Sequence, residues 1–93
     1  MVNKTLKNYI LENSDNKKTN KKENYVLTTH YNNKNKVIGL VSTANYLKII
    51  KYDENGFKIF EEDSDGNWEK RKYKNGSIIQ FSTSSGTHWT KNN

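Results

Sequence analysis

The chain has no cysteine, and only 31% of its residues are hydrophobic. Without cysteine there can be no disulfides or thiolate metal sites, and this absence is compatible with a reducing cytoplasm. No apolar run approaches the roughly 20 residues that span a bilayer, and the N-terminus lacks the apolar region of a secretory signal. We therefore expect a cytoplasmic protein with a thin core and no membrane partner.

A repeat of 21 residues is present, which indicates one small hairpin unit copied along the chain. The last copy lacks one residue between Tyr73 and Gly76 and gains one between Gly86 and Trp89, which restores the tryptophan spacing. Asn35 and Asn45 stand where later copies have glycine, so the turns are also expected to be copied. The equally spaced residues are Tyr31, Tyr52 and Tyr73, and Val26, Leu47, Trp68 and Trp89.

Seven β-branched and aromatic runs, each ended by turn residues, predict seven strands. The fold class is therefore mainly β: an antiparallel meander of about seven strands, built from 21-residue hairpin repeats and preceded by a short helix. The predicted strands are Tyr25–Tyr31, Lys36–Ser42, Tyr46–Tyr52, Phe57–Glu62, Asn67–Tyr73, Ser77–Ser82 and Thr87–Lys91.

The chain divides into three parts by composition. Residues 1–13 form the short N-terminal helix, because Leu6, Tyr9 and Ile10 share one helical face. Residues 14–24 hold four lysines and no apolar residue, which predicts a solvated linker or disordered arm. Residues 25–93 form the β-repeat domain.

The repeat leaves one geometrical question open. Trp68 and Tyr73 are five residues apart, so a regular strand points them to opposite faces. Either a β-bulge realigns them or both faces of the sheet carry aromatic rings.

The tyrosine and aspartate pattern resembles a known type of repeat. Tyr52-Asp53-Glu54-Asn55-Gly56, Asp63-Ser64-Asp65-Gly66, Tyr73 and Gly76 are similar to the Tyr-Asp repeats of RHS-type proteins and to MORN-like variant repeats of bacteria and phages. The resemblance covers roughly residues 46–90 well and residues 24–45 weakly. It implies successive β-hairpins, and it implies no catalytic residue and no activity.

Candidates for chemistry are few. His30 and His88 are the only imidazoles, and His30 stands where Lys51 and Lys72 stand in later copies. A general-base site would also need a carboxylate held against the imidazole. Asp63-Ser64-Asp65-Gly66 resembles the start of a calcium loop, but Lys74 stands where the loop needs its bidentate glutamate. We expect no enzymatic activity, no cofactor and no metal.

Charge is segregated along the chain. Residues 25–51 hold four lysines and no acid, residues 52–69 hold seven acids and Lys58, and residues 70–93 hold five cations and no acid. Equivalent strands of a meander lie two strands apart, so we expect His30, Lys51 and Lys72 in one row. The residues predicted to contact a partner are Lys48, Lys51, Trp68, Lys70, Arg71, Lys72, Tyr73, Lys74 and Trp89.

Two binding functions and one purely structural interpretation follow. Lysines with interleaved rings are typical of single-stranded nucleic-acid binding, although the seven acids would repel phosphates. Separate stripes of both charge signs suit a protein partner better, with rings as hot spots. Alternatively, the rings are only core and the charges only a solubility coat.

Small size, the Lys/Asn-rich composition of an AT-rich genome and the lack of a catalytic set are typical of phage-encoded inhibitors. We therefore predict an anti-defence, anti-CRISPR-like inhibitor that occupies a protein or ribonucleoprotein effector handling nucleic acid, in the host cytoplasm if a phage encodes it. The alternatives are a direct RNA or single-stranded DNA binder and an immunity or antitoxin protein. Open edges at Tyr25–Tyr31 and Thr87–Lys91 also permit a homodimer.

Overall fold

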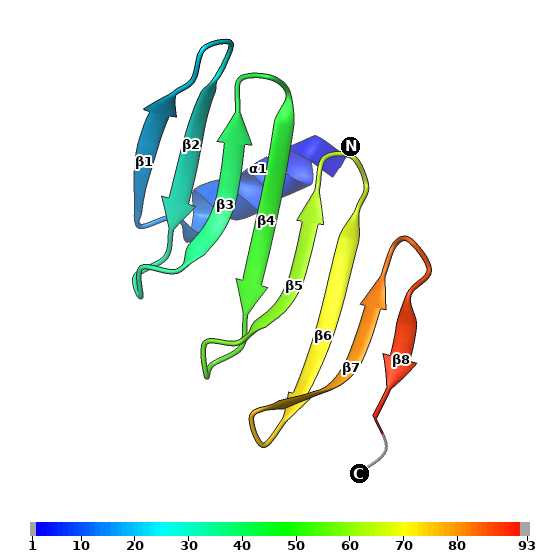
Figure 1. Cartoon of the computed structure of the whole chain (residues 1–93). Coiled ribbons are helices and arrows are strands. Elements are labelled where there is room, and N and C mark those ends of the chain that lie inside the picture. The colour runs from blue at the N-terminus through cyan, green and yellow to red at the C-terminus, as the bar shows by residue number, and fades with distance from the viewer. Residues whose placement is uncertain (1, 92–93) are drawn as a thin grey trace.

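The described part of the chain forms an eight-stranded antiparallel sheet with one helix on one side of it. Figure 1 shows this arrangement. The computed structural model describes residues 2–91, with side chains from Thr5 onward. Each strand pairs with the next one in sequence, so the predicted meander is confirmed, with eight strands in place of about seven. The elements are α1 Val2–Asn13, β1 Asn16–Lys21, β2 Val26–Tyr31, β3 Val37–Ser42, β4 Tyr46–Tyr52, β5 Lys58–Asp63, β6 Trp68–Lys74, β7 Ser77–Thr83 and β8 His88–Thr90.

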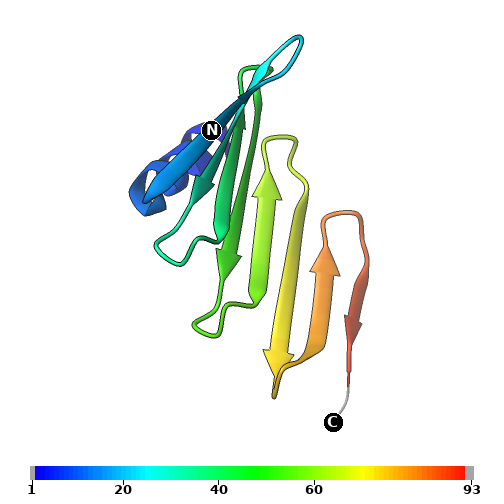
Figure 2. The same ribbon diagram turned by 60° about the vertical axis from the view of Figure 1, so that its left-hand side comes forward.

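The core lies between α1 and the first half of the sheet. Leu6 and Ile10, one helical turn apart, are each 1% exposed and pack on Ile49 of β4. Gly39 of β3 lets the helix approach closely, since a Cβ there would lie 2.5 Å from Ile10 Cγ1. Helix α1 contacts β4 and β3, and Figure 2 shows that β7 and β8 lie away from it.

The turns are copied together with their hydrogen bonds. Asp53 Oδ1 accepts the backbone N–H groups of Asn55 and Phe57, at 2.9 and 3.0 Å, and Asp63 accepts the corresponding pair one turn later. The side-chain oxygen thus satisfies two turn amides. Gly56 and Asn35 have φ values of 87° and 60°, as the repeat predicts.

A β-bulge recurs in each hairpin that follows an even-numbered strand. The register shifts between His30 and Tyr31, between Lys51 and Tyr52, and between Lys72 and Tyr73. The extra residues lie in the partner strands β3, β5 and β7, so β6 itself alternates regularly. The question raised by the sequence is therefore settled: Trp68 and Tyr73 point to opposite faces, and both faces carry aromatic rings.

The prediction of a linker over residues 14–24 is wrong for Asn16–Lys21, which form strand β1. All six residues pair with β2, although all six are exposed. Pairing needs only the backbone groups that the edge of β2 supplies, and the apolar pattern used for the prediction does not report on those. Consequently β2 is not an edge strand, and the two edges of the sheet are β1 and β8.

The expected alignment of Trp89 with Trp68 is also wrong. Trp68 pairs with Glu62, whereas its counterpart in the last hairpin, paired with Ser82, is His88. Trp89 pairs with Phe81 and lies on the other face. The final copy is one residue shorter up to its turn, and in a strand a displacement of one residue exchanges the faces.

Candidate binding face

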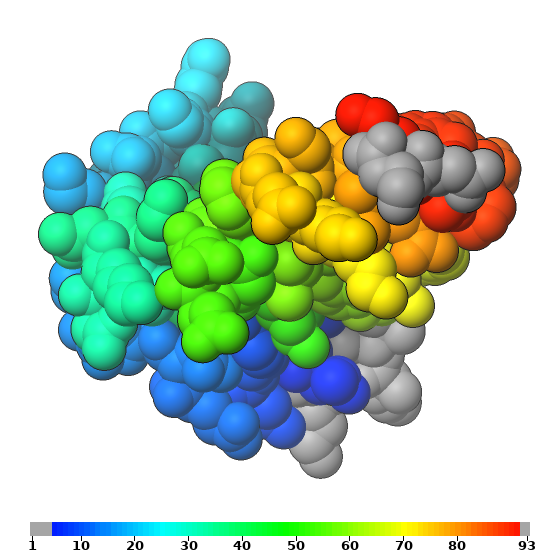
Figure 3. Space-filling model, turned by 90° about the horizontal axis from the view of Figure 1, so that it is seen from below, coloured from blue at the N-terminus to red at the C-terminus, as the bar shows by residue number. Residues whose placement is uncertain are grey.

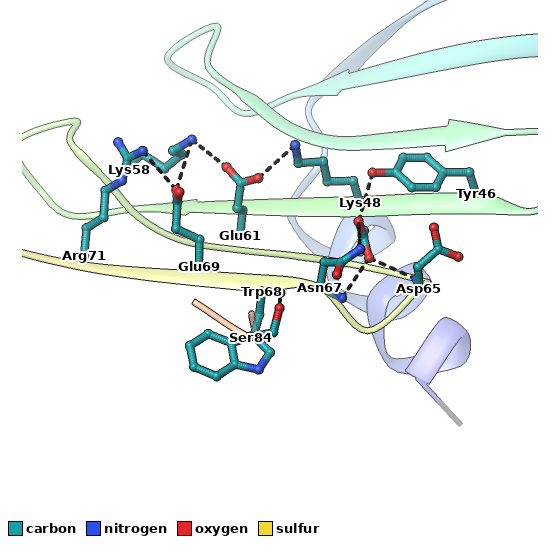
Figure 4. A network of polar contacts seen from close by, with 11 residues as sticks. Tyr46, Lys48, Lys58, Glu61, Asp65, Asn67, Trp68, Glu69, Arg71 and Ser84 are labelled. Atoms are coloured by element: carbon teal, nitrogen blue, oxygen red, sulfur yellow. Dashed lines mark hydrogen bonds and ion pairs between the residues drawn. The ribbon is translucent and has the colours of Figure 1, made fainter. Parts of the chain in front are cut away.

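The two faces of the sheet differ in whether their charged side chains form ion pairs with one another. We call the side that carries α1 the helix-side face and the other side the opposite face. In Figure 4, the carboxylates of Glu61 and Glu69 extend to one side of the strands and the ring of Trp68 extends to the other. Alternation along β6 accordingly places Glu69 and Arg71 on the opposite face, and Trp68, Lys70 and Lys72 on the helix-side face.

Charges on the opposite face pair with one another. Glu61 bonds to Lys48 at 2.8 Å and to Lys58, and Glu69 lies 3.0 Å from Arg71 and 3.6 Å from Lys58. Burial by itself would raise the pKa of Glu61, but the bonds from the two lysines outweigh it and lower that pKa. In this network, drawn in Figure 4, each of the three cations already has a carboxylate partner.

Aromatic pairs complete the opposite face. Phe57 stacks on Tyr73 with ring centroids 4.9 Å apart, and Phe81 lies 6.1 Å from Trp89. The Arg71 guanidinium lies 5.6 Å from the centroid of Phe81. Tyr73, Trp89 and Arg71 are thus engaged with neighbours within the sheet.

A row of side chains crosses five strands on the helix-side face. Direct register partners link Lys51 to Phe60, Phe60 to Lys70, Lys70 to Ser82, and Ser82 to His88. Four steps of about 4.8 Å make the row roughly 19 Å long. A cation, a ring, a cation, a hydroxyl and an imidazole therefore follow one another across the sheet.

Two lysines of this face lie over rings, and none of its three lysines pairs with an acid among the described residues. Lys51 Nζ is 5.0 Å from the centroid of Tyr9 and 5.4 Å from that of Phe60, and Lys70 Nζ is 5.2 Å from that of Trp68. Among the described side chains of residues 5–91, no carboxylate comes within 4 Å of Lys51, Lys70 or Lys72. Their charge is available to an external anion.

A hollow of about 510 Å³ lies over β5, β6 and β7, beyond the end of the helix-covered part. Ile59, Phe60, Lys70, Lys72 and Gln80 are among its lining residues. In Figure 3 the C-terminal strands, coloured yellow to red, extend past the blue helix. We call the helix-side surface over β5 to β8, together with Lys51 at the border of the helix contact, the open face. Its residues are Lys51, Phe60, Glu62, Trp68, Lys70, Lys72, Gln80, Ser82, His88 and Thr90.

The residues predicted to contact a partner do not share one surface. Lys51, Trp68, Lys70 and Lys72 lie on the open face, and alternation places the exposed Lys74 at the same side of β6. The other four predicted residues lie on the opposite face: Lys48, Arg71, Tyr73 and Trp89.

Sequence reasoning missed Phe60, Gln80 and Ser82. Each of them is a direct register partner of a predicted lysine. These residues could have been found by writing out the antiparallel register of consecutive hairpins. That register also requires the positions of the β-bulges, because each bulge shifts the pairing by one residue.

Both histidines bond to a serine hydroxyl. His30 Nδ1 lies 2.9 Å from Ser14 Oγ, and His88 Nδ1 lies 2.9 Å from Ser82 Oγ. The Ser82 and His88 pair, of which Ser82 lines the hollow, resembles two members of a nucleophilic triad. Within residues 5–91 no acid contacts either imidazole, so the orienting third group is lacking.

His30 should make the stability of the fold depend on pH. Burial and, to a lesser extent, nearby Lys17 lower the pKa of His30 below its usual 6.5. At a pH near or below 6.5, His30 therefore binds a proton more readily in the unfolded chain than in the folded chain. The free energy of unfolding should consequently fall as pH drops below about 6.5. Urea titrations at pH 7.5 and 5.5 measure this difference.

A variant pair isolates the contribution of His30. The replacement His30→Gln should shrink the difference between pH 7.5 and 5.5, whereas His88→Gln, at an exposed histidine of β8, should retain it. Equal pH dependence in the wild type and His30→Gln would contradict the assignment.

Comparisons with known proteins identify no relative. No protein-family model, no curated protein and no solved structure matches this chain. The similarity to Tyr-Asp repeats therefore rests on the residues quoted above and stays a prediction. Within the described part of the chain, no helix is long and apolar enough to cross a membrane.

Proposed function

We propose that this protein is a non-enzymatic binding protein that acts by occupancy, with the open face holding an anionic partner. One observation carries the proposal: acids and bases pair with one another on the opposite face, while Lys51, Lys70 and Lys72 have no acid partner among residues 5–91, and Lys70 and Lys72 line a hollow. Surface charges that served only solubility would not need to be paired on the opposite face and unpaired on the open face.

The anti-defence role predicted from the sequence is one form of this function, and with the cytoplasmic location it stays a prediction. The open face adds a condition on the effector that such an inhibitor could occupy. Like charges across an interface are costly, so an empty cationic channel is a poor partner. An effector that exposes bound nucleic acid or an acidic surface is a good one.

Heparin chromatography tests the open face with a polyanion that has no bases. The variant Lys70→Glu/Lys72→Glu should elute at clearly lower salt than the wild type, because it reverses two unpaired charges on this face. The matched control is Lys18→Glu/Lys22→Glu, with the same change of net charge at exposed positions in and just after β1. The control should elute closer to the wild type. Identical elution of both variants would mean that net charge alone governs binding.

A further inference from the structure

We infer that the partner of the open face is a single-stranded nucleic acid, with a base stacked on Trp68 and phosphates held by Lys51, Lys70 and Lys72. This inference rests on the proposed function and specifies its partner. Charge complementarity is the first support, because three cations without acid partners line one continuous surface.

Most of the acids that argue against phosphate binding in the sequence lie away from the open face; among the described residues the exceptions are Glu62, the register partner of Trp68, and Asp53, which lines the hollow. Glu61 and Glu69 pair with cations on the opposite face. Asp53 and Asp63 accept hydrogen bonds from backbone N–H groups of the turns. Among the strand residues of the helix-side face in β5 to β8, Glu62 is the one acid within the described chain. The acidic stripe therefore does not separate the basic parts of the open face.

The chemistry of the surface favours unpaired bases over a docked protein helix. An amphipathic helix needs a continuous apolar groove, but the positions beside Lys70 and Lys72 carry Ser82 and Gln80, and His88 follows Ser82 on the next strand. The ring of Trp68 is half-buried against the sheet, and rings of this kind stack on any base that is not already paired. Duplexes hide those base faces, so a single strand is the better fit.

The geometry also predicts the direction of the strand. Lys51, Phe60 and Lys70 are successive register partners, so cations alternate with a ring across the β-strands and not along one of them. The nucleic acid should accordingly cross the strands along the row that ends at His88. A row of roughly 19 Å accommodates a segment of a few nucleotides.

Fluorescence anisotropy with labelled 15-nucleotide oligouridine, oligothymidine and a duplex of the same length tests the inference. Both single strands should bind the full chain at low salt, and the duplex should bind more weakly. Three phosphate contacts give a slope of log K against log salt of about −2 for single strands. Stronger binding to the duplex would overturn base stacking.

Two tryptophan variants isolate the ring. Trp68→Leu should weaken oligouridine binding roughly 5- to 150-fold, and Trp68→Phe should recover most of it, because a ring is restored. Trp89→Leu makes the same chemical change on the opposite face and should leave affinity unchanged. In Trp89→Leu the remaining tryptophan is Trp68, so its emission should change on oligonucleotide binding. Unchanged emission at saturation would overturn the assignment.

The two proposals fail in distinguishable ways. Heparin binding that depends on Lys70 and Lys72, with no oligonucleotide binding at low salt, would refute the nucleic-acid inference and leave the anionic-partner function intact. Displacement of heparin by poly-glutamate but not by oligouridine would likewise refute it and favour an acidic protein. If the folded wild type bound neither heparin nor the oligonucleotides, both proposals would be refuted.

Discussion

Replacement of Leu6 by alanine is expected to lower the free energy of unfolding by about 2–5 kcal/mol. Leu6 is 1% exposed and packs with Ile10 against Ile49, so the truncation removes contacts and leaves a cavity. The effect is large for this protein because small domains have total stabilities of only about 5–15 kcal/mol. Urea denaturation followed by circular dichroism measures it.

The same helix offers a matched control. Leu11 is 64% exposed, so Leu11→Ala should change the free energy of unfolding by no more than about 0.5 kcal/mol. Equal losses in the two variants would show that α1 does not pack on the sheet through Leu6. If Leu6→Ala does not fold, the milder variant Leu6→Val tests the same contact. It should unfold at a lower urea concentration than the wild type.

The replacement Gly39→Ala is expected to cost about 1–3 kcal/mol by overpacking. The added Cβ would lie 2.5 Å from Ile10 Cγ1 and 2.7 Å from Ile10 Cδ1, so the helix must shift away from β3. Gly39 needs no positive φ, which means that the cost reports crowding alone.

A double-mutant cycle checks this explanation. Ile10→Ala removes the atoms that the new methyl group meets, so the pair Gly39→Ala/Ile10→Ala should lose less stability than the sum of the two single variants, by about 1 kcal/mol or more. Additive losses would contradict a direct clash between these two residues.

Much of the fold could be predicted because its determinants are local. The 21-residue spacing and the Asp53 and Asp63 turns place the hairpins, and Leu6 and Ile10 indicate the helix face. Strand β1 could not be predicted from an apolar pattern, since its stability comes from backbone pairing with β2 and its side chains remain in water.

The candidate site was harder to predict because it depends on which face each side chain takes. Spacing correctly placed Lys51 and Lys72 on one side, but the expected row of His30, Lys51 and Lys72 is wrong, since Lys51 aligns through Phe60 with Lys70. Composition blocks could not show that Lys48 and Arg71 are paired on the other side. Trp89 shows the limit most clearly, since one missing residue near Gly76 moves its ring across the sheet.

The position of α1 has a consequence for how such a protein can evolve. The helix anchors on β3 and β4, and each hairpin pairs only with its neighbours. Duplication of one more module after β6 would leave the buried residues untouched and widen the footprint by two strands, about 10 Å. Gene duplication could then lengthen the stretch of polymer that the protein contacts without changing the buried contacts that stabilise the fold.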